Sequence, residues 1–323
     1  MDVQMKTHRI AGFVSAAAIA VVFSASTALA QRGAAPPPTP SPGPGSIEEV
    51  APPGNNYDIA EFRFWAPPAA GPLQAIAVLV PGSNGDGRAA ADDSVWQAFA
   101  TSHHVALVAC HFKDKTHPQS FIEAYVNVSQ GSGQALLDAV NKFAARSKHP
   151  ELATAPFLMW GMSAGGQFNY EFTAWKPERV AAFVVNKGGI YFSAMVSPEA
   201  RAVPGILFIG GKDLESRIWM ISGLFAVNRR GGALWSLTNE PGAGHIVGQS
   251  RDMAIAFYDD ILPMRIGVNN TLKPIAEKAG FTGDLKTKTY TAIGDSKVST
   301  EPNSWFPTER VARIWQTIET SKP

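Results

Sequence analysis

Cysteine and charge are what this sequence of 323 residues has least of. Its one cysteine, Cys110, excludes an intramolecular disulfide framework and a zinc site built from several cysteines. Charged residues make up 17% of the chain, below the roughly 25% that is usual for soluble domains. The 28 basic and 27 acidic side chains leave a net charge of +1, so no strong positive field attracts nucleic acid and we expect no nucleic-acid partner. Hydrophobic residues make up 45%, which is enough for a sizeable core.

The start of the chain has the pattern of an export signal. Lys6 and Arg9 supply a positive beginning, and residues 10–23 form an apolar run that fits a signal peptide and is short for a membrane span. A site with small residues on both sides of one leucine ends at Ala30, so we predict a signal peptide over residues 1–30 that is cleaved there. We therefore expect a secreted or periplasmic protein that no membrane holds after cleavage. An uncleaved anchor is the alternative.

A proline-rich stretch follows over residues 31–56. Because proline fixes φ and removes a backbone donor, we expect this stretch to form neither a sheet nor a helix and to act as a semi-extended linker. Residues 57–270 are expected to form one folded domain. Residues 271–323 are less regular, and we expect them to be a C-terminal extension packed on the same domain.

Strand-like and helix-like stretches alternate through the folded part. Continuous apolar runs indicate buried strands, and apolar residues at helical spacing indicate the helices between them. The predicted strands are residues 61–65, 75–80, 105–110, 156–160, 180–185, 206–209 and 233–237. The predicted helices are residues 89–101, 132–147 with Ser132 as the cap, a helix beginning near Ala164, and residues 216–229, 249–262 and 307–320. This alternation predicts an α/β fold with a mostly parallel central sheet, helices on both faces, and ligands bound beyond the carboxyl ends of the strands.

A serine flanked by glycines follows the strand predicted over residues 156–160. In the segment Gly161-Met162-Ser163-Ala164-Gly165, the glycines permit a crowded strand-to-helix turn that pushes the Ser163 hydroxyl out over the sheet edge. The start of the following helix favours developing negative charge. The pattern alone is a weak signal, but its place between a buried strand and a helix makes Ser163 our candidate nucleophile. The alternative is a glycine-rich structural turn.

A serine hydroxyl needs a base before it can act as a nucleophile. His245 follows the strand predicted over residues 233–237, in a loop whose glycines allow the imidazole to lie over Ser163. We predict that His245 is this base. The alternative is a histidine in a surface loop.

The base in turn needs a carboxylate that holds its tautomer. Asp213 follows the strand predicted over residues 206–209, and we predict that it has this role. Glu215 and Glu240 are rival acids. A solvated loop carboxylate beside Lys212 is the alternative for Asp213.

Two backbone N–H groups are needed where negative charge appears during such a reaction. One is expected from Ala164, directly after the nucleophile, and the other from Ser83 in the loop after residues 75–80, with Asn84 as the alternate. This loop lacks both the Lys-Ser/Thr ending and the G-x-G-x-x-G spacing of nucleotide-binding loops. We therefore expect no nucleotide and no other cofactor.

Further polar residues follow the predicted strands. His111 and Lys187 are our weaker candidates for substrate binding, and His117 in the next loop also has a place from which to line a pocket. A metal site would need Cys110 and His111 to act together with Asp114 and His117. Neighbouring residues of a strand point to opposite faces, so we expect no metal there and predict that Cys110 is a small apolar core residue.

On these residues the chain resembles secreted serine hydrolases of the α/β-hydrolase superfamily, particularly bacterial esterases and polyester-depolymerase-like enzymes. The resemblance covers about residues 61–262. It rests on four segments, in this order along the chain: Pro81-Gly82-Ser83, Gly161-x-Ser163-x-Gly165, Asp213 and Gly244-His245. The chain departs from the family in having Pro-Gly where His-Gly is usual and in lacking the paired cysteines of many exported polyester hydrolases.

The resemblance implies an α/β-hydrolase catalytic domain over residues 57–270. It implies hydrolysis of a carboxylic ester, small or polymeric, through an acyl-enzyme on Ser163 with His245 as base. An amide-cleaving peptidase with the same three residues is one alternative, and a non-catalytic binding protein on the same scaffold is another. The sequence indicates no oligomeric state.

Overall fold

The computed structural model describes residues 41–68, 71–118, 122–294 and 302–322. Its main feature is an eight-stranded sheet in the order β1-β2-β4-β3-β5-β6-β7-β8. The strands are β1 (Ile47–Ala51), β2 (Tyr57–Trp65), β3 (Ala75–Val80), β4 (Val105–Asp114), β5 (Phe157–Met162), β6 (Val180–Asn186), β7 (Gly205–Gly210) and β8 (Trp235–Glu240). Strand β2 runs antiparallel to β1 and β4, and the neighbours from β4 to β8 are all parallel. The predicted mostly parallel sheet is therefore confirmed.

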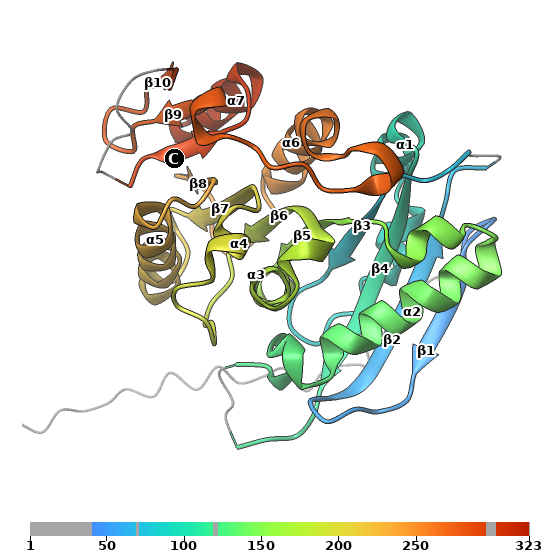
Figure 1. The fold of residues 1–323 in the computed structure, drawn as a ribbon. Coiled ribbons are helices and arrows are strands. Elements are labelled where there is room, and N and C mark those ends of the chain that lie inside the picture. Colours follow the sequence, from blue (N-terminus) through green and yellow to red (C-terminus); the bar gives the residue numbers. More distant parts are fainter. Residues whose placement is uncertain (1–40, 69–70, 119–121, 295–301, 323) are drawn as a thin grey trace, which may run out of the picture. The chain divides into compact units, whose positions relative to one another are not determined.

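Helices cover both faces of this sheet, with α2, α3 and α5 drawn below it and α1 and α6 above it (Figure 1). The helices are α1 (Ser94–His103), α2 (Ser132–Ser147), α3 (Ala164–Trp175), α4 (Pro198–Arg201), α5 (Glu215–Arg230), α6 (Ser250–Arg265) and α7 (Glu309–Glu319). Apolar side chains of α2, α3 and α5 form one core with one face of the sheet. Those of α1, α6 and α7 form a second core with the other face. Since both faces are covered, the strands between them read as continuous apolar runs, and every residue of β3, β6 and β7 is buried.

Two local predictions differ from the structure. Strand β4 continues beyond residue 110 to Asp114, so His111 lies within a strand and not after one. Ser132 does not cap α2: Gly131 is the residue before the helix, and the Ser132 hydroxyl donates to the Tyr125 carbonyl at 2.5 Å.

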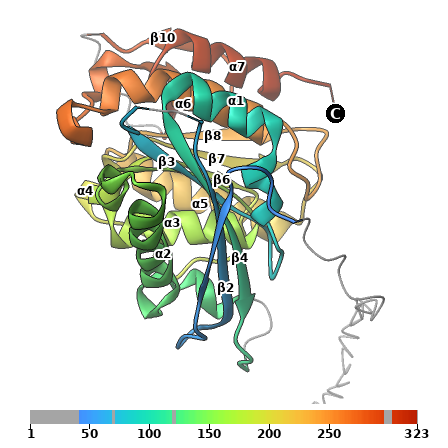
Figure 2. The ribbon, with the colours of Figure 1, turned by 90° about the vertical axis from the view of Figure 1, so that its right-hand side faces the viewer.

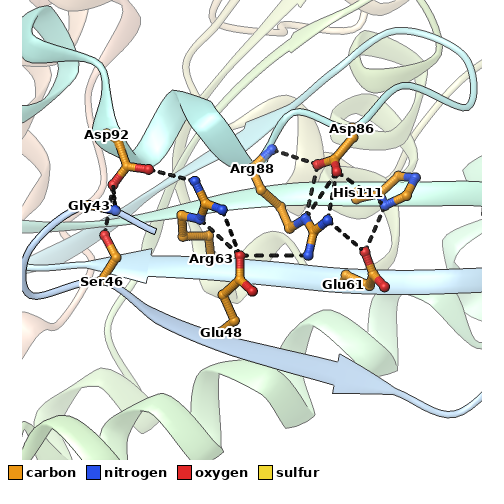
Figure 3. Close-up of polar contacts among 9 residues, drawn as sticks. All are labelled: Gly43, Ser46, Glu48, Glu61, Arg63, Asp86, Arg88, Asp92 and His111. Atoms are coloured by element: carbon orange, nitrogen blue, oxygen red, sulfur yellow. Dashed lines mark hydrogen bonds and ion pairs between the residues drawn. The ribbon is translucent and has the colours of Figure 1, made fainter. Parts of the chain in front are cut away.

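The prediction that residues 31–56 form no sheet is wrong for residues 47–51, which pair as β1 along β2. A buried cation fixes the position of this strand (Figure 3). The Arg63 side chain on β2 is 1% exposed and forms ion pairs with Glu48 of β1 at 2.8 Å and with Asp92 at 2.6 Å. A buried arginine needs such acidic partners because its desolvation is costly. The prolines that suggested a linker flank β1 and do not interrupt it.

The C-terminal segment covers the open edge of the main sheet at β8, and Figure 2 shows α7 lying beside α6. It contributes α7 and a small sheet in the order β10-β9-β11, formed by β9 (Phe281–Gly283), β10 (Tyr290–Ala292) and β11 (Ser304–Phe306). The Ser304 hydroxyl accepts from the Leu237 N–H at 2.9 Å, and Trp315 Nε1 donates to the Leu237 carbonyl at 2.9 Å. These contacts use backbone groups that an edge strand otherwise leaves unpaired.

Residues 39–323 belong to one compact unit, with no division near residue 270. The predicted signal peptide and its cleavage site lie outside the described residues. Among the helices of the described ranges, none combines the length and the apolar character needed to cross a membrane.

Candidate active site

Three side chains meet at the carboxyl edge of the sheet in a hydrogen-bonded relay. Ser163 follows β5, Asp213 lies in the loop after β7, and His245 lies in the loop after β8. His245 Nε2 is 3.0 Å from Ser163 Oγ, and His245 Nδ1 is 2.9 Å from Asp213 Oδ2. An ionised Asp213 accepts only, so Nδ1 carries the proton and Nε2 is left to accept from the serine hydroxyl. The His245 side chain is 35% exposed, which opens the relay to solvent.

Ser163 lies on a strained turn between β5 and α3. Its φ is +53° and its ψ is −122°, a conformation that is costly for any residue with a side chain. The Ser163 N–H donates to the Asn186 carbonyl at 2.8 Å, which fixes the turn against β6. Glycine is required on both sides, because a Cβ on Gly161 would lie 2.3 Å from the Gly165 backbone. A Cβ on Gly165 would lie 2.1 Å from the Val80 carbonyl oxygen.

Gly165→Ala is expected to displace this turn, since the new methyl group meets backbone atoms that cannot move aside. We expect the free energy of unfolding to fall by about 1–3 kcal/mol or more, and the rate of a reaction at Ser163 to fall about 10²-fold. Gly223→Ala in α5 is the matched control, because no atom apart from the neighbouring backbone of its own helix lies within 4 Å of its added Cβ. It should raise the free energy of unfolding by about 0.5–1 kcal/mol. Denaturant unfolding measures the stability of both variants. Equal stabilities would contradict the steric crowding at Gly165.

Asp213 is held as an anion in a nearly closed pocket of donors. Its side chain is 3% exposed, and Oδ1 accepts from the Leu214 N–H at 2.8 Å and from Arg217 Nη1 at 2.5 Å. Burial alone would raise the pKa of Asp213, but the hydrogen bonds from His245 and Leu214 and the charge of Arg217 bring that pKa below its ordinary value. Sequence reasoning did not identify Arg217. Its spacing of four residues from Asp213, at the start of α5, was the available signal.

The lowered pKa of Asp213 predicts how stability depends on pH. The folded state favours the ionised form, so this carboxylate stabilises the fold above the pKa of an unfolded aspartate, about 3.9. This contribution disappears as the pH falls through the lower folded pKa. We expect the difference in the free energy of unfolding between the wild type and Asp213→Asn to shrink steadily below about pH 4. A difference that grew with acid would show that the pKa of Asp213 is raised instead.

The prediction that Lys187 binds substrate is wrong. Lys187 is fully buried, and its Nζ forms an ion pair with Glu240 and donates to Asn186 Oδ1 at 3.0 Å. Glu240 is therefore engaged elsewhere and is not the acid of the relay. The other rival, Glu215, is exposed at the start of α5.

This buried pair belongs to a network that connects the turn of Ser163, through Asn186, with the loop that carries His245. Glu240 ends β8 and also accepts from the Gln249 N–H at 2.6 Å, so it closes the loop that holds His245. Asn186 Nδ2 donates to the Val247 carbonyl at 3.0 Å in the same loop. Because the Asn186 carbonyl accepts from the Ser163 N–H, one network fixes both ends of the serine–histidine contact.

The proposed backbone donors lie beside the serine. A Cβ on Gly82 would be 3.6 Å from the Ser163 Cβ, so the loop after β3 borders the hydroxyl. Among the described residues, the N–H groups of Ser83 and Ala164 donate to no protein acceptor, as expected for groups that await a ligand. The alternate donor, the Asn84 N–H, is already bonded to the Tyr125 hydroxyl at 3.3 Å.

His111 belongs to a separate ionic cluster on β2, β4 and the loop after β3 (Figure 3). Its Nδ1 is 2.9 Å from Glu61 Oε2, and it lines neither cavity described below. The ligand atoms of His111, Glu61 and Asp86 lie within 4.8 Å of one another. Arg88, however, pairs with both carboxylates, at 3.1 and 2.7 Å, so a guanidinium balances their charge. Cys110 is buried in the core, as predicted, and is not one of the residues of this cluster.

Two adjoining cavities open at the same edge of the sheet. One has a volume of about 500 Å³ and the other of about 400 Å³. The smaller cavity begins at Ser83, and the larger reaches Ile190 and Phe192 in the loop after β6. Both are lined by His117 and Ile122. His117 thus lines a pocket, as its place after a strand indicated.

Comparison with known proteins gives matches in three-dimensional structure only: no protein-family model and no curated protein matches the chain. A poly(3-hydroxybutyrate) depolymerase from Bordetella parapertussis is similar with a TM-score of 0.50 and 16% identity, over 67% of this chain and 88% of that one. A poly(aspartic acid) hydrolase from Sphingomonas sp. KT-1 has a TM-score of 0.48 and 15% identity, over 66% of this chain and 98% of that one. An esterase from Pyrobaculum calidifontis has a TM-score of 0.46 and 15% identity, over 68% of this chain and 85% of that one.

At such identities the likeness concerns the fold and not the reaction. The sheet order, the sharp turn between β5 and α3 and the likeness to the depolymerase agree with one another. The chain therefore has the fold of the α/β-hydrolase superfamily.

Proposed function

We propose that this chain is an exported serine hydrolase that cleaves a carboxylic ester. The observation that carries the proposal is the relay of Ser163, His245 and Asp213, with contacts of 3.0 and 2.9 Å on a strained turn. The names of the similar solved structures, a depolymerase and an esterase among them, agree with it. Export rests on the pattern of residues 1–30 alone.

The geometry accounts for each step of such a reaction. His245 Nε2 takes the proton of the Ser163 hydroxyl while the oxygen attacks the ester carbonyl. The N–H groups of Ser83 and Ala164 stabilise the oxyanion, and Asp213 stabilises the imidazolium. The C–O bond to the alcohol then breaks, and the alcohol leaves with the proton from His245. Water, activated by the same imidazole, attacks the acyl-enzyme and releases the acid.

Labelling with a fluorophosphonate probe tests this proposal. The mature chain from Gln31 should react at Ser163, identified by mass spectrometry of the labelled peptide, and the heat-denatured protein should not. Failure to label would favour the non-catalytic scaffold. Matched esters and anilides of one acyl group then separate ester from amide hydrolysis. We expect faster turnover of the ester, and equal or better turnover of the anilide would identify a peptidase.

A further inference from the structure

The larger of the two cavities lies between loops that follow strands on either side of β3 and β5. The walls of the larger cavity come from the loop after β4, which holds Ile122 and Ala124, and from the loop after β6, which holds Ile190 and Phe192. In the sheet, β3 and β5 lie between those two strands, and their carboxyl ends lead to Ser83 and Ser163. The cavity therefore lies at the same edge as the relay.

Both walls are fixed to that site by hydrogen bonds. The Tyr125 hydroxyl accepts from the Asn84 N–H, which ties the first wall to the loop of Ser83. On the second wall, Gln167 Oε1 accepts from the Gly189 N–H at 3.0 Å. Glu171 Oε1 accepts from the Phe192 N–H at 2.7 Å. Gln167 and Glu171 lie one turn apart on α3, the helix that begins directly after Ser163, so the second wall is anchored to the same helix as the serine.

One histidine in the cavity has an unused nitrogen. His117 Nε2 is 2.6 Å from Asp114 Oδ2, whereas its Nδ1 is buried and has no hydrogen-bond partner among the described residues. Asp114 is itself held, because its Oδ1 accepts from the Ala124 N–H at 2.6 Å. The carboxylate accepts the Nε2 proton, which leaves a lone pair on Nδ1. A buried acceptor without a donor is costly, unless a ligand supplies the donor.

We propose that His117 is a specificity-determining residue that accepts a hydrogen bond from one arm of the substrate. This inference rests on the proposed function. The arm is uncharged and carries a hydroxyl or an amide N–H group, because the described residues that line the larger cavity are all uncharged or histidine. Its chain packs on Ile122, Ala124 and Ile190, and a volume of about 500 Å³ suits a ligand of ordinary small-molecule size.

Four esters of one chain length test the proposal. They differ only in the group at the end of one arm, which is a hydroxyl, carboxamide, methoxy or methyl group. The end group is placed on the acyl arm in one set and on the alcohol arm in another. The wild type should prefer the hydroxyl or carboxamide ester over the methoxy ester by at least about tenfold in kcat/KM (about 1.4 kcal/mol). His117→Leu should bring this ratio close to one, mainly by slowing the donor-bearing ester. An unchanged ratio would overturn the proposal.

Asp114→Asn provides a sharper version of this test. The new amide oxygen can still accept from the Ala124 N–H, while its NH₂ group faces His117 Nε2 and donates to it. Nδ1 then carries the proton and becomes a donor. The preference for hydroxyl over methoxy should vanish in this variant, because a methoxy oxygen accepts as well as a hydroxyl does. Retention of the preference would contradict the assigned tautomer and with it the proposal.

His149→Leu is the matched control. His149 also pairs with a carboxylate, at 2.8 Å from Glu151, but it precedes β5 and so lies at the opposite edge of the sheet. Its replacement should leave the ratio between the esters unchanged. If it changes the ratio as much as His117→Leu does, the effect is general and the subsite is not at His117.

A binding measurement separates failure of the subsite from failure of the proposed function. In Ser163→Ala with ¹⁵N-labelled histidine, 1,4-butanediol and its dimethyl ether are added as probes. The diol should shift the His117 Nδ1 resonance, and the ether should not. If the wild type hydrolyses a short ester but His117 shows no such shift, the proposed function stands and the subsite is contradicted. If His117 shows the shift but no ester is hydrolysed, the subsite stands and the proposed function is contradicted.

Discussion

Ser163→Ala is expected to lower kcat for a chromogenic ester by a factor on the order of 10⁴–10⁶, the effect of removing the nucleophile from such a relay. The variant should fold normally, since alanine keeps the Cβ and the backbone strain at φ +53° is the same. Its fluorophosphonate labelling should be abolished. Steady-state kinetics and the unfolding midpoint of one preparation measure both effects.

Ser102→Ala is the control for this change. Ser102 is an exposed serine on α1 whose hydroxyl bonds to the Ala98 carbonyl within the helix. Its replacement should leave turnover and labelling unchanged. Hydrolysis by Ser163→Ala at more than about one hundredth of the wild-type rate would place the nucleophile elsewhere.

Lys187→Met is expected to destabilise the fold by about 3–5 kcal/mol, because it leaves Glu240 as a buried charge without its partner. Glu240→Gln should lower the free energy of unfolding by a similar amount, because it leaves the charge of Lys187 buried without its partner. The double variant should regain most of this loss, since a neutral pair of similar volume removes both uncompensated charges. The glutamine can also still accept from the Gln249 N–H. Urea unfolding of all four proteins completes the cycle.

An exposed ion pair provides the comparison. Arg313 and Glu309 lie on α7 at 2.9 Å, with side chains 68% and 53% exposed. Arg313→Met should leave stability almost unchanged, because water screens such a pair. Equal effects of Lys187→Met and Arg313→Met, or a double variant no more stable than the single ones, would contradict the role given to the buried pair.

The fold and the relay were accessible from the sequence because they depend on signals that are local along the chain. Strand β3 was predicted with its observed bounds, and the other strands from β4 to β8 within a few residues, since burial on both faces makes them continuous apolar runs. The parallel arrangement then brings the residues that follow these strands to one edge. Ser163, Asp213 and His245 each follow a strand, and the structure brings the three together.

What the sequence could not provide are partners chosen across the fold. Lys187 was a candidate for substrate binding because it follows a predicted strand, and only the structure places it against Glu240, 53 residues away. Strand β1 was missed because the pairing of Glu48 with Arg63 outweighs the prolines around it. The spare nitrogen of His117 depends on Asp114 taking the other one, which no spacing rule predicts.

The burial of Cys110 makes the chain suitable for site-specific fluorescence. The thiol lies inside the main sheet, where burial raises its pKa and keeps it out of reach of maleimides. A cysteine introduced at exposed Ser102 would then accept a single dye without removal of the native residue. The same feature makes expression in a reducing cytoplasm straightforward, because maturation requires no oxidative step.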